Sequence, residues 1–238
     1  MQIPLTLVSA RAPMEMEDTI NKLDLNSIHV AFNGGLIYEV NNGKKNILYK
    51  KYLQFSVARE LALVLREQFP KLSISVYDEE NWNTDIIDDG ILYKQNITKK
   101  DFNIVNFKEY FNNYHEVFKL MLITFDDNEM EKINNFLAKY SDKNISVLRS
   151  GKNHLEITHS LAMKSTGIKF IQYLKNITKK DCVAFGDGHN DIPMFECTEY
   201  RVVMDNALAD IKKYANFVTK SNDKDGVVYA IKKYVKYL

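Results

Sequence analysis

The stretch Cys182–Asp191 reads CVAFGDGHND and joins a short apolar run to a loop of glycine, carboxylate and carboxamide residues. We expect Cys182 to Phe185 to form a buried strand and Ile192 to Glu196 to begin a helix. Gly186 and Gly188 permit a sharp backbone turn between them. A buried strand, a polar loop and a helix in succession are typical of a doubly wound parallel sheet, whose ligands bind beyond the carboxyl ends of the strands.

The same alternation continues on both sides of this stretch. A helix at Lys164 to Leu174 is expected directly before this stretch, and towards the C-terminus we expect helices at Ala207 to Tyr214 and Val227 to Leu238, with strands at Arg201 to Met204 and Phe217 to Thr219. Towards the N-terminus we expect a buried strand at Ile3 to Val8, a helix at Met14 to Leu23, a strand at Ile28 to Phe32, and a hairpin of Leu36 to Val40 with Ile47 to Leu53. The sequence therefore predicts an α/β protein with a doubly wound parallel sheet.

The middle of the chain has a different pattern and is predicted to be an independent α+β unit, residues 48–157. Its expected elements are helices at Val57 to Phe69 and Asn128 to Tyr140, the latter capped by Asp127 or Asn128, and strands at Leu72 to Tyr77, Val117 to Phe125, Ile145 to Arg149 and His154 to Ile157. The aromatic residues of this unit, including Trp82, Tyr77 and Tyr93, are expected to form its core. Residues 1–47 and 158–238 would then form one core domain into which the unit is inserted.

Composition excludes several classes of protein. The 238 residues carry a formal net charge of +1, which offers no general attraction to nucleic acid or to acidic membranes. The apolar start, Ile3 to Ala10, is too short to span a bilayer, and we find no transmembrane segment or signal peptide. The two cysteines, Cys182 and Cys197, form neither a zinc motif nor a disulfide framework, which favours a cytoplasmic location.

Two carboxylates and a carboxamide gather in the loop that follows Phe185. Asp187, Asn190 and Asp191 supply hard oxygen ligands of the kind that Mg²⁺ prefers, with room left for water and a substrate phosphate. Glycine, aspartate and asparagine are also common turn residues, so this loop alone favours a plain turn over a metal site.

The wider pattern resembles a known family. The segment Gly186-Asp187-Gly188-x-Asn190-Asp191-x-x-Met194 resembles the fourth motif of haloacid-dehalogenase-type phosphatases in its Cof-like form. Further segments resemble other family motifs in the family's order: Ser9 to Pro13, Asn33 to Gly35, Leu155 to Ile157 followed by Lys164, Val203 to Ala207, and Asn222 to Val227. The resemblance covers almost the whole chain. It implies a Rossmann-like core, and it identifies residues 48–157 as the cap domain that shapes substrate specificity.

The resemblance also implies roles for individual residues. Asp187 would bind Mg²⁺, and Asp191 would support the metal directly or through water. Lys164 would neutralise phosphate charge and orient the nucleophile, so that Lys164 and Asp187 are the candidate catalytic residues. Without the resemblance, Lys164 would be interpreted as a solvated lysine at the start of a helix. His189 is expected to point to solvent.

A second set of residues would bind the substrate phosphate. Ser9 would donate its hydroxyl, with the backbone N–H of Ala10 beside it, and Asn33, Asn190 and Lys164 would complete the set. Alternatively, Ser9 could be a helix N-cap. Arg11, in the same loop, could contact substrate or form a surface ion pair.

The sequence holds no Asp-x-Asp-Gly-Thr segment, which supplies the nucleophile and the general acid/base in this family. By the resemblance, that segment would precede Ser9 and end a central strand between the Ser9 and Asp187 strands, so we expect two open strand edges. A start assigned at an internal methionine, a truncated gene, direct pairing of the flanking strands, or a strand borrowed from a partner would each account for this. We favour truncation.

The resemblance therefore implies a Mg²⁺-dependent phosphatase acting on small phosphorylated metabolites such as sugar phosphates. We expect the chain as written to be inactive or impaired, since it lacks the nucleophile. The alternative is a non-catalytic phosphate-binding pseudoenzyme or truncated gene product. Neither hypothesis involves nucleic acid or a membrane as partner.

Overall fold

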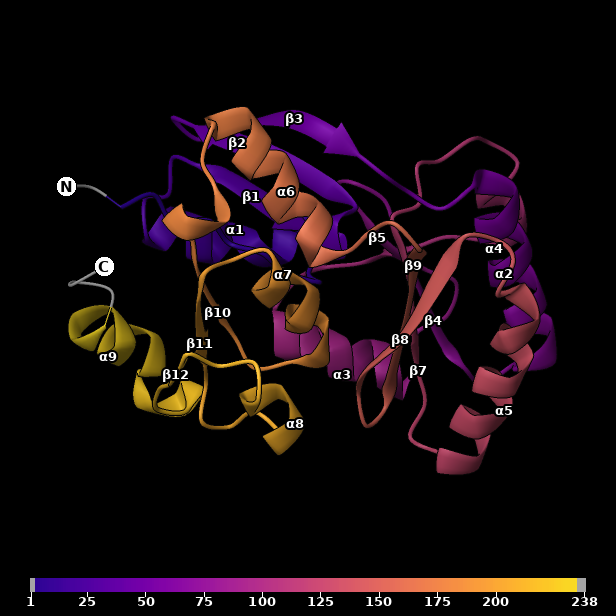
Figure 1. Cartoon of the computed structure of the whole chain (residues 1–238). Helices are drawn as coiled ribbons and strands as arrows, with labels where there is room; N and C mark the ends of the chain where they lie inside the picture. Colours follow the sequence, from indigo (N-terminus) through magenta and orange to yellow (C-terminus); the bar gives the residue numbers. More distant parts are fainter. Residues whose placement is uncertain (1–2, 235–238) are drawn as a thin grey trace. The chain divides into compact units, whose positions relative to one another are not determined.

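The computed structural model describes residues 3–234 (Figure 1). The chain divides into two compact units, Met1–Ala162 and Met163–Leu238. Each unit has its own sheets, which confirms a mixed α/β protein. The predicted grouping of residues 1–47 with 158–238 as one domain stays a prediction. Among the helices described, none is long and apolar enough to cross a membrane.

The first unit begins with a helix and a small antiparallel sheet. Helix α1 (Pro13–Lys22) is followed by β1 (Ile28–Ala31), a 3-10 turn (Phe32–Gly34), β2 (Leu36–Asn41) and β3 (Lys44–Lys50), and the strand order is β1-β2-β3. Asn42 and Gly43 have φ values of 50° and 73° between β2 and β3. Positive φ at both positions favours a tight hairpin, which confirms the predicted pairing of these two segments.

The predicted buried strand at Ile3 to Val8 is wrong. Only Val8 forms a bridge, parallel to Val30, while Ile3 and Leu5 are 66% and 42% exposed. The backbone of this segment follows β1 through two hydrogen bonds, from Val30 N to Leu7 O and from Ser9 N to Val30 O. It has a strand neighbour on that side alone within the described part of this unit, and Leu7 packs partly buried against the core while Ile3 and Leu5 stay exposed. A run of apolar residues predicts an extended backbone, but it does not identify which other segments would bury its side chains.

The rest of the first unit is built on a six-stranded sheet in the order β6-β5-β4-β7-β9-β8. The strands are β4 (Ser73–Tyr77), β5 (Trp82–Thr84), β6 (Asn103–Ile104), β7 (Lys119–Ile123), β8 (Ile145–Gly151) and β9 (His154–His159). The helices are α2 (Phe55–Gln68), α3 (Asp89–Thr98), α4 (Phe107–Tyr110) and α5 (Asp127–Leu137), which continues into a 3-10 turn (Ala138–Tyr140). Neighbouring strands are antiparallel except β5 and β6.

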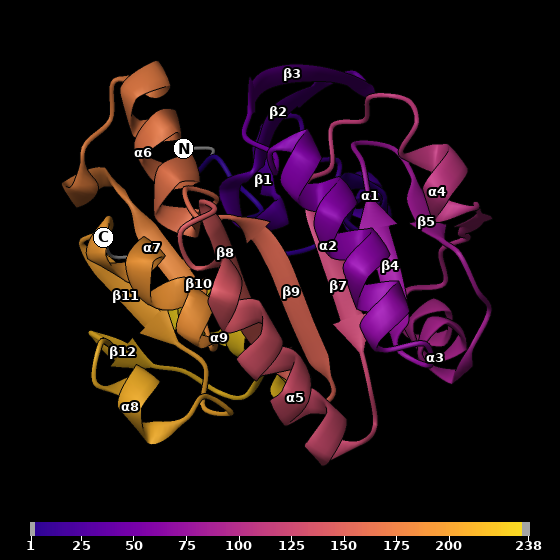
Figure 2. The same cartoon turned by 90° about the vertical axis from the view of Figure 1, so that its right-hand side faces the viewer.

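The two faces of this sheet differ in chemistry. On one face, Ile74, Val76, Leu120, Leu122, Leu155 and Ile157 pack in one cluster with residues of α2 and α5. Figure 2 shows these two helices side by side on that face. Because side chains alternate along a strand, the opposite face carries Ser73, Ser75, Tyr77, Lys119, Met121, Glu156 and Thr158, all of them buried. Residues of α1 and α3 pack on this second face, through Met16, Ile20 and Ile91.

Two details of this unit differ from expectation. The N-cap of α5 is Asp126, whose carboxylate accepts from the N–H groups of Asn128 and Glu129, so the predicted caps Asp127 and Asn128 are wrong. Asp126, Asp127 and Asn128 follow one another and each can cap a helix, so the sequence left the choice open. Trp82 and Tyr77 are buried as expected, whereas Tyr93 is 40% exposed and does not belong to the core.

The second unit alternates strands and helices around the parallel sheet β10-β11-β12. Its strands are β10 (Val183–Gly186), β11 (Tyr200–Val203) and β12 (Phe217–Val218), and its helices are α6 (Lys164–Lys175), α7 (Ile192–Glu196), α8 (Ala209–Lys212) and α9 (Gly226–Lys233). Short 3-10 turns occur at Lys179–Asp181, His189–Asp191 and Asn222–Lys224. The predicted parallel alternation is confirmed here. The end of the predicted last helix, residues 235–238, lies outside the described residues.

Candidate functional site

The loop after β10 is organised by the buried carboxylate of Asp191. Its Oδ2 accepts hydrogen bonds from the backbone N–H groups of Asp187 and Gly188, both 2.9 Å long. Its Oδ1 lies 2.5 Å from Nζ of Lys164, with both side chains buried. Asp191 therefore closes its own loop and joins it to the start of α6.

The two glycines of this loop lie close to the side chains that fold back onto it, and the space is tightest at Gly186. A Cβ on Gly186 would lie 2.6 Å from the Asp191 carboxylate carbon, and one on Gly188 would lie 2.7 Å from Oδ1 of Asn190. Gly188 has φ of −107°, and neither glycine has a positive φ. Their lack of a side chain lets the carboxylate and the carboxamide fold back onto the backbone, whereas the sequence suggested only a sharp turn.

Lys164 is the first residue of α6 and is 8% exposed. The only carboxylate within ion-pair distance of it in the described part of the chain is Asp191. Lys164 is therefore a buried, paired lysine and not a solvated one. A buried amine beside a polar loop at the end of a parallel strand is well placed to meet an anion.

Asp187 joins the loop to two other segments of the second unit. Its Oδ2 accepts from Nδ2 of Asn206 at 2.6 Å, and Oδ1 of Asn206 accepts from the N–H of Asn222 at 2.9 Å. These are the loops after β10, β11 and β12, which Figure 1 shows in the orange and yellow part of the chain. The sequence segments that resemble family motifs thus meet through direct hydrogen bonds within this unit.

His189 and Asn190 complete the loop. His189 is exposed, as expected, and its Nε2 lies 2.8 Å from Oδ2 of Asp210. This hydrogen bond lowers the pKa of the Asp210 carboxyl. Asn190 is half-buried in the 3-10 turn that leads into α7.

The donor set of this loop fits Mg²⁺. No group of three or more His, Cys, Asp or Glu side chains suited to a metal ion occurs among residues 3–234. Mg²⁺ commonly takes one or two carboxylates and fills its remaining positions with water and substrate phosphate, so two carboxylates are compatible. Both oxygens of Asp191 already accept hydrogen bonds, so Asp187 would be the better direct ligand and Asp191 would act through water if Mg²⁺ bound here.

The N-terminal loop forms a second group, within the first unit. Ser9 donates its N–H to Val30 O at 2.9 Å and accepts at its carbonyl from the N–H of Asn33, also at 2.9 Å. Its Oγ accepts from the N–H of Arg11 at 3.2 Å. The N-cap of α1 is Ala12, so Ser9 is not a helix cap. The structure thus brings Ser9, Ala10 and Asn33 into one turn, with the Arg11 side chain exposed.

The Asn33 turn has an unusual backbone. Phe32 and Asn33 have φ values of 50° and 58°, and Gly34 has φ of 112°. Asparagine tolerates the left-handed region, but a bulky phenylalanine adopts it rarely, and such strained residues gather at functional sites. Phe32 is fully buried and stacked on Phe118 with the ring centroids 5.0 Å apart, which holds it in this conformation.

The predicted site residues therefore fall into two groups, Ser9, Ala10 and Asn33 in the first unit and Lys164, Asp187, Asn190 and Asp191 in the second. Their functional roles stay predictions. Sequence reasoning missed two charged residues beside the first group, Glu15 and Lys119, which are 8% and 1% exposed. The available signal was a lysine at the head of an otherwise apolar strand, Lys119 to Ile123.

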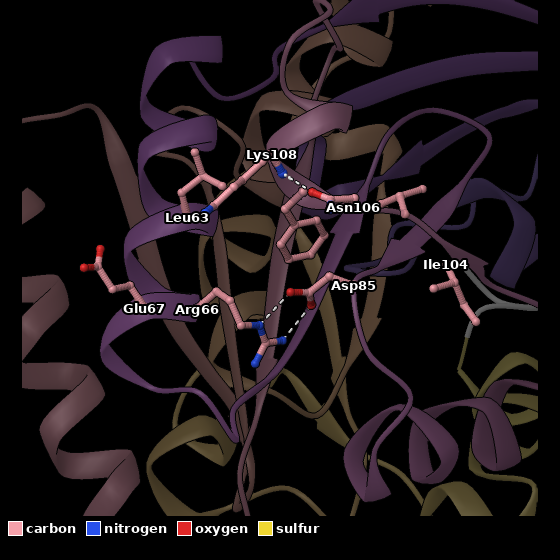
Figure 3. Close-up of a pocket in the computed structure, with 9 residues that line it drawn as sticks. Leu63, Arg66, Glu67, Asp85, Ile104, Asn106 and Lys108 are labelled. Atoms are coloured by element: carbon pink, nitrogen blue, oxygen red, sulfur yellow. Dashed lines mark hydrogen bonds and ion pairs between the residues drawn. The ribbon is translucent and has the colours of Figure 1, made fainter.

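A cavity of about 810 Å³ lies in the first unit between α2 and the segment around β6, and none of the predicted site residues lines it (Figure 3). Its most prominent polar group is Arg66, which forms a bidentate ion pair with Asp85 through two contacts of 2.6 Å. The remaining guanidinium nitrogen, Nη1, donates to Pro70 O and Leu72 O. This arginine is therefore fully engaged in contacts within the fold.

Comparison with known proteins agrees with this geometry. The family model of haloacid dehalogenase-like hydrolases matches residues 1–231. A Haemophilus influenzae protein named "Putative phosphatase" is 30% identical over 94% of this chain and 82% of its own length. The 5-amino-6-(5-phospho-D-ribitylamino)uracil phosphatase YwtE of Bacillus subtilis is 27% identical over 96% of this chain and 85% of its own length.

Among solved structures, a haloacid dehalogenase-like hydrolase from Bacteroides thetaiotaomicron superposes with a TM-score of 0.86 and 26% identity. The match covers 96% of this chain and 85% of that one. The chain belongs to the haloacid dehalogenase-like hydrolase family, in its Cof-like group. By resemblance to its relatives it is a phosphatase, a hydrolase of phosphoric monoesters.

Proposed function

We propose that this protein is a Mg²⁺-dependent phosphatase of small phosphorylated metabolites. The observation that carries the proposal is the buried arrangement of Lys164, Asp191 and the Asp187 loop at the end of β10. Two carboxylates and a buried lysine combine the charges that bind a hard cation with the charge that binds a phosphate. A plain surface turn would not bury a lysine and an aspartate together.

In this proposal each residue has a distinct task. Asp187 would hold Mg²⁺, which when bound supplies charge that stabilises the phosphoryl group. Lys164 would neutralise phosphate charge, held in position by Asp191. The Ser9 hydroxyl and the Ala10 N–H would donate to phosphate oxygens. These groups act by electrostatic stabilisation and supply no covalent nucleophile.

We further propose that a chain of these 238 residues binds phosphate with Mg²⁺ but turns over esters poorly. The support is the absence of an Asp-x-Asp-Gly-Thr segment from the printed sequence, because metal and lysine alone give no covalent route. The alternative, a non-catalytic phosphate-binding protein, predicts the same binding and differs only when a nucleophile segment is supplied.

The test uses calorimetry and turnover together. Inorganic phosphate should bind to the wild-type chain in the presence of Mg²⁺, and Asp187→Asn or Lys164→Met should weaken that binding by about tenfold or more. Hydrolysis of p-nitrophenyl phosphate should be near background and should rise when the nucleophile segment of a relative is joined ahead of Met1. Absence of phosphate binding in the wild type would sink the proposal. Turnover that Asp187→Asn abolishes in the unmodified chain would overturn the predicted impairment.

We propose phosphorylated sugars or sugar alcohols as the substrate class. One relative is named for a substrate whose phosphate is carried on a ribityl group, which supports a polyhydroxylated carrier. A screen of sugar and sugar-alcohol phosphates on the extended chain tests this proposal. We also propose a reducing, cytoplasmic setting, supported by Cys182 and Cys197 being free thiols.

A further inference from the structure

The Ser9–Ala12 turn is held at each of its peptide planes. In the plane that joins Ala10 to Arg11, the Ala10 carbonyl accepts from Lys119 Nζ at 3.0 Å, and the Arg11 N–H donates to Ser9 Oγ at 3.2 Å. The plane is thus fixed on both sides, by a side chain from β7 and by the serine hydroxyl.

The next plane, which joins Arg11 to Ala12, is fixed in the same way. The Arg11 carbonyl accepts from the N–H of Phe32 at 3.0 Å. The Ala12 N–H donates to Oε2 of Glu15 at 2.8 Å, and Oε1 of Glu15 lies 2.7 Å from Nζ of Lys94 on α3. A chain of contacts therefore runs from α3 through α1 to the turn.

This arrangement decides which polar groups of the turn remain available. The Ser9 hydroxyl accepts from Arg11, so its own hydrogen is directed to another acceptor. The Ala10 N–H has no hydrogen-bond partner in the described part of the chain, although the carbonyls of Ser9, Ala10 and Arg11 are all occupied. The turn thus presents hydrogen-bond donors and keeps its acceptors engaged, which suits an anion.

Burying the charged Lys119 side chain costs more free energy than one hydrogen bond to a carbonyl returns. Lys119 is 1% exposed, and its Nζ lies 4.7 Å from the ring centroid of Tyr77 and 5.8 Å from that of Phe32. Its charge acts on Glu15 and, together with Lys94, lowers the pKa of that carboxyl despite the opposing effect of burial. Replacing a buried ion pair by apolar residues is often neutral or stabilising, so stability alone does not account for this cluster.

We infer that Lys119 and Glu15 are positioning residues that hold the Ser9–Ala12 turn in its anion-binding conformation. This inference rests on the proposed function. It assigns to the six-stranded sheet, through Lys119 at the head of β7, an indirect part in binding the substrate phosphate. Neither residue is expected to touch the phosphate itself.

The test measures phosphate affinity by calorimetry with Mg²⁺ present. Lys119→Met should weaken phosphate binding by about tenfold, the worth of a hydrogen bond to a charged group, while Mg²⁺ affinity stays unchanged. Lys119→Arg, which keeps a charged donor, should recover binding to within about threefold of the wild type. Leu120→Ala is the matched control, since it destabilises the same strand from its apolar face and should not change phosphate affinity.

A second measurement does not depend on any variant folding. In the ¹⁵N-labelled wild-type chain, phosphate should shift the Ala10 amide resonance and slow its hydrogen exchange. An Ala10 amide that ignores bound phosphate overturns the inference. Unchanged affinity in Lys119→Met, when Lys164→Met loses binding, also overturns the inference. In both cases the proposed Mg²⁺-dependent phosphatase site at Lys164 and Asp187 survives, although the first result removes Ala10 from the phosphate ligands. A wild-type chain that binds no phosphate overturns both.

Discussion

Nζ of Lys164 and Oδ1 of Asp191 lie 2.5 Å apart with their side chains 9% and 5% exposed. The two residues are separated by 27 positions in the sequence and connect the start of α6 to the loop after β10. Because Oδ2 of the same aspartate binds two backbone amides, one side chain fixes both the lysine and the loop. The pair is therefore expected to control the stability of the second unit as well as its binding properties.

Asp191→Asn should destabilise the chain by about 3 kcal/mol, since it leaves a buried lysine without its counter-charge. The amide can still accept from one loop N–H, so the unit should fold. Urea unfolding followed by circular dichroism measures the change. Asp210→Asn, which breaks the exposed pair with His189, is the control and should have no measurable effect. Equal stabilities for the two variants would contradict this prediction.

Gly186→Ala should disturb the loop because the new Cβ would lie 2.6 Å from the Asp191 carboxylate. We expect a loss of about 1–3 kcal/mol, the usual cost of overpacking, together with weaker Mg²⁺ binding. Gly151→Ala, whose Cβ would come no closer than 3.3 Å to His154, should be tolerated. Thermal unfolding with and without Mg²⁺ checks both effects, and a Gly186→Ala chain with wild-type values would refute the spatial role of this glycine.

The Glu15 carboxylate should stabilise the fold in a pH-dependent way. Burial raises its pKa, but Lys119 and Lys94 lower it further, so the net pKa lies below the ordinary value of 4.5. The stabilisation is therefore complete above about pH 4.5 and is lost as pH falls through the folded-state pKa. Glu15→Gln should lower the free energy of unfolding by about 3 kcal/mol at pH 7. The difference in unfolding free energy between this variant and the wild type should become smaller towards pH 4. Urea midpoints at pH 7, 5 and 4 test this, and a constant gap would contradict it.

His29 should make the first unit sensitive to mild acid. It is fully buried, and burial lowers the pKa of its ring below 6.5 despite a backbone hydrogen bond that raises it. The folded state then binds fewer protons than the unfolded state, so stability falls as pH drops below 6.5. Between pH 6.5 and pH 5, the free energy of unfolding measured with urea should fall less steeply with decreasing pH in His29→Gln than in the wild type. A slope that persists unchanged would point to His154, whose pKa burial also lowers.

The sequence predicted the second unit better than the first, for a physical reason. Strands β10, β11 and β12 are short apolar runs separated by helices, and such alternation has few alternative folds. The run Ile3 to Val8 has the same apolar pattern as these strands, yet Ile3 and Leu5 are exposed. Burial depends on neighbouring segments, which cannot be identified from a local sequence pattern. The β2–β3 hairpin was predictable from Asn42 and Gly43, whose conformations suit only a tight turn.

For the candidate site, motif spacing identified Lys164, Asp187 and Asp191 but not how they are joined. The hydrogen bonds from two loop amides to Asp191 follow from a backbone shape that the residue types do not specify. The role of Lys119 could not be predicted for a different reason. Its partner Ala10 lies 109 positions away in the sequence and contributes only its backbone carbonyl. Long-range contacts to main-chain atoms leave no trace in side-chain patterns.

The alternation along β4, β7 and β9 has a practical consequence for engineering. In β4 and β7, odd-numbered positions such as Tyr77 and Lys119 lie on one face and even-numbered positions such as Val76 and Leu120 on the other, whereas in β9 the even-numbered Thr158 shares the face of Lys119. Both faces are packed, one in the cluster with α2 and α5 and the other in the cluster with α1 and α3, so substitutions on either face should be limited to residues of similar volume and polarity. A single-residue insertion within β7 would exchange the two registers beyond it, so indels there should be far more damaging than substitutions.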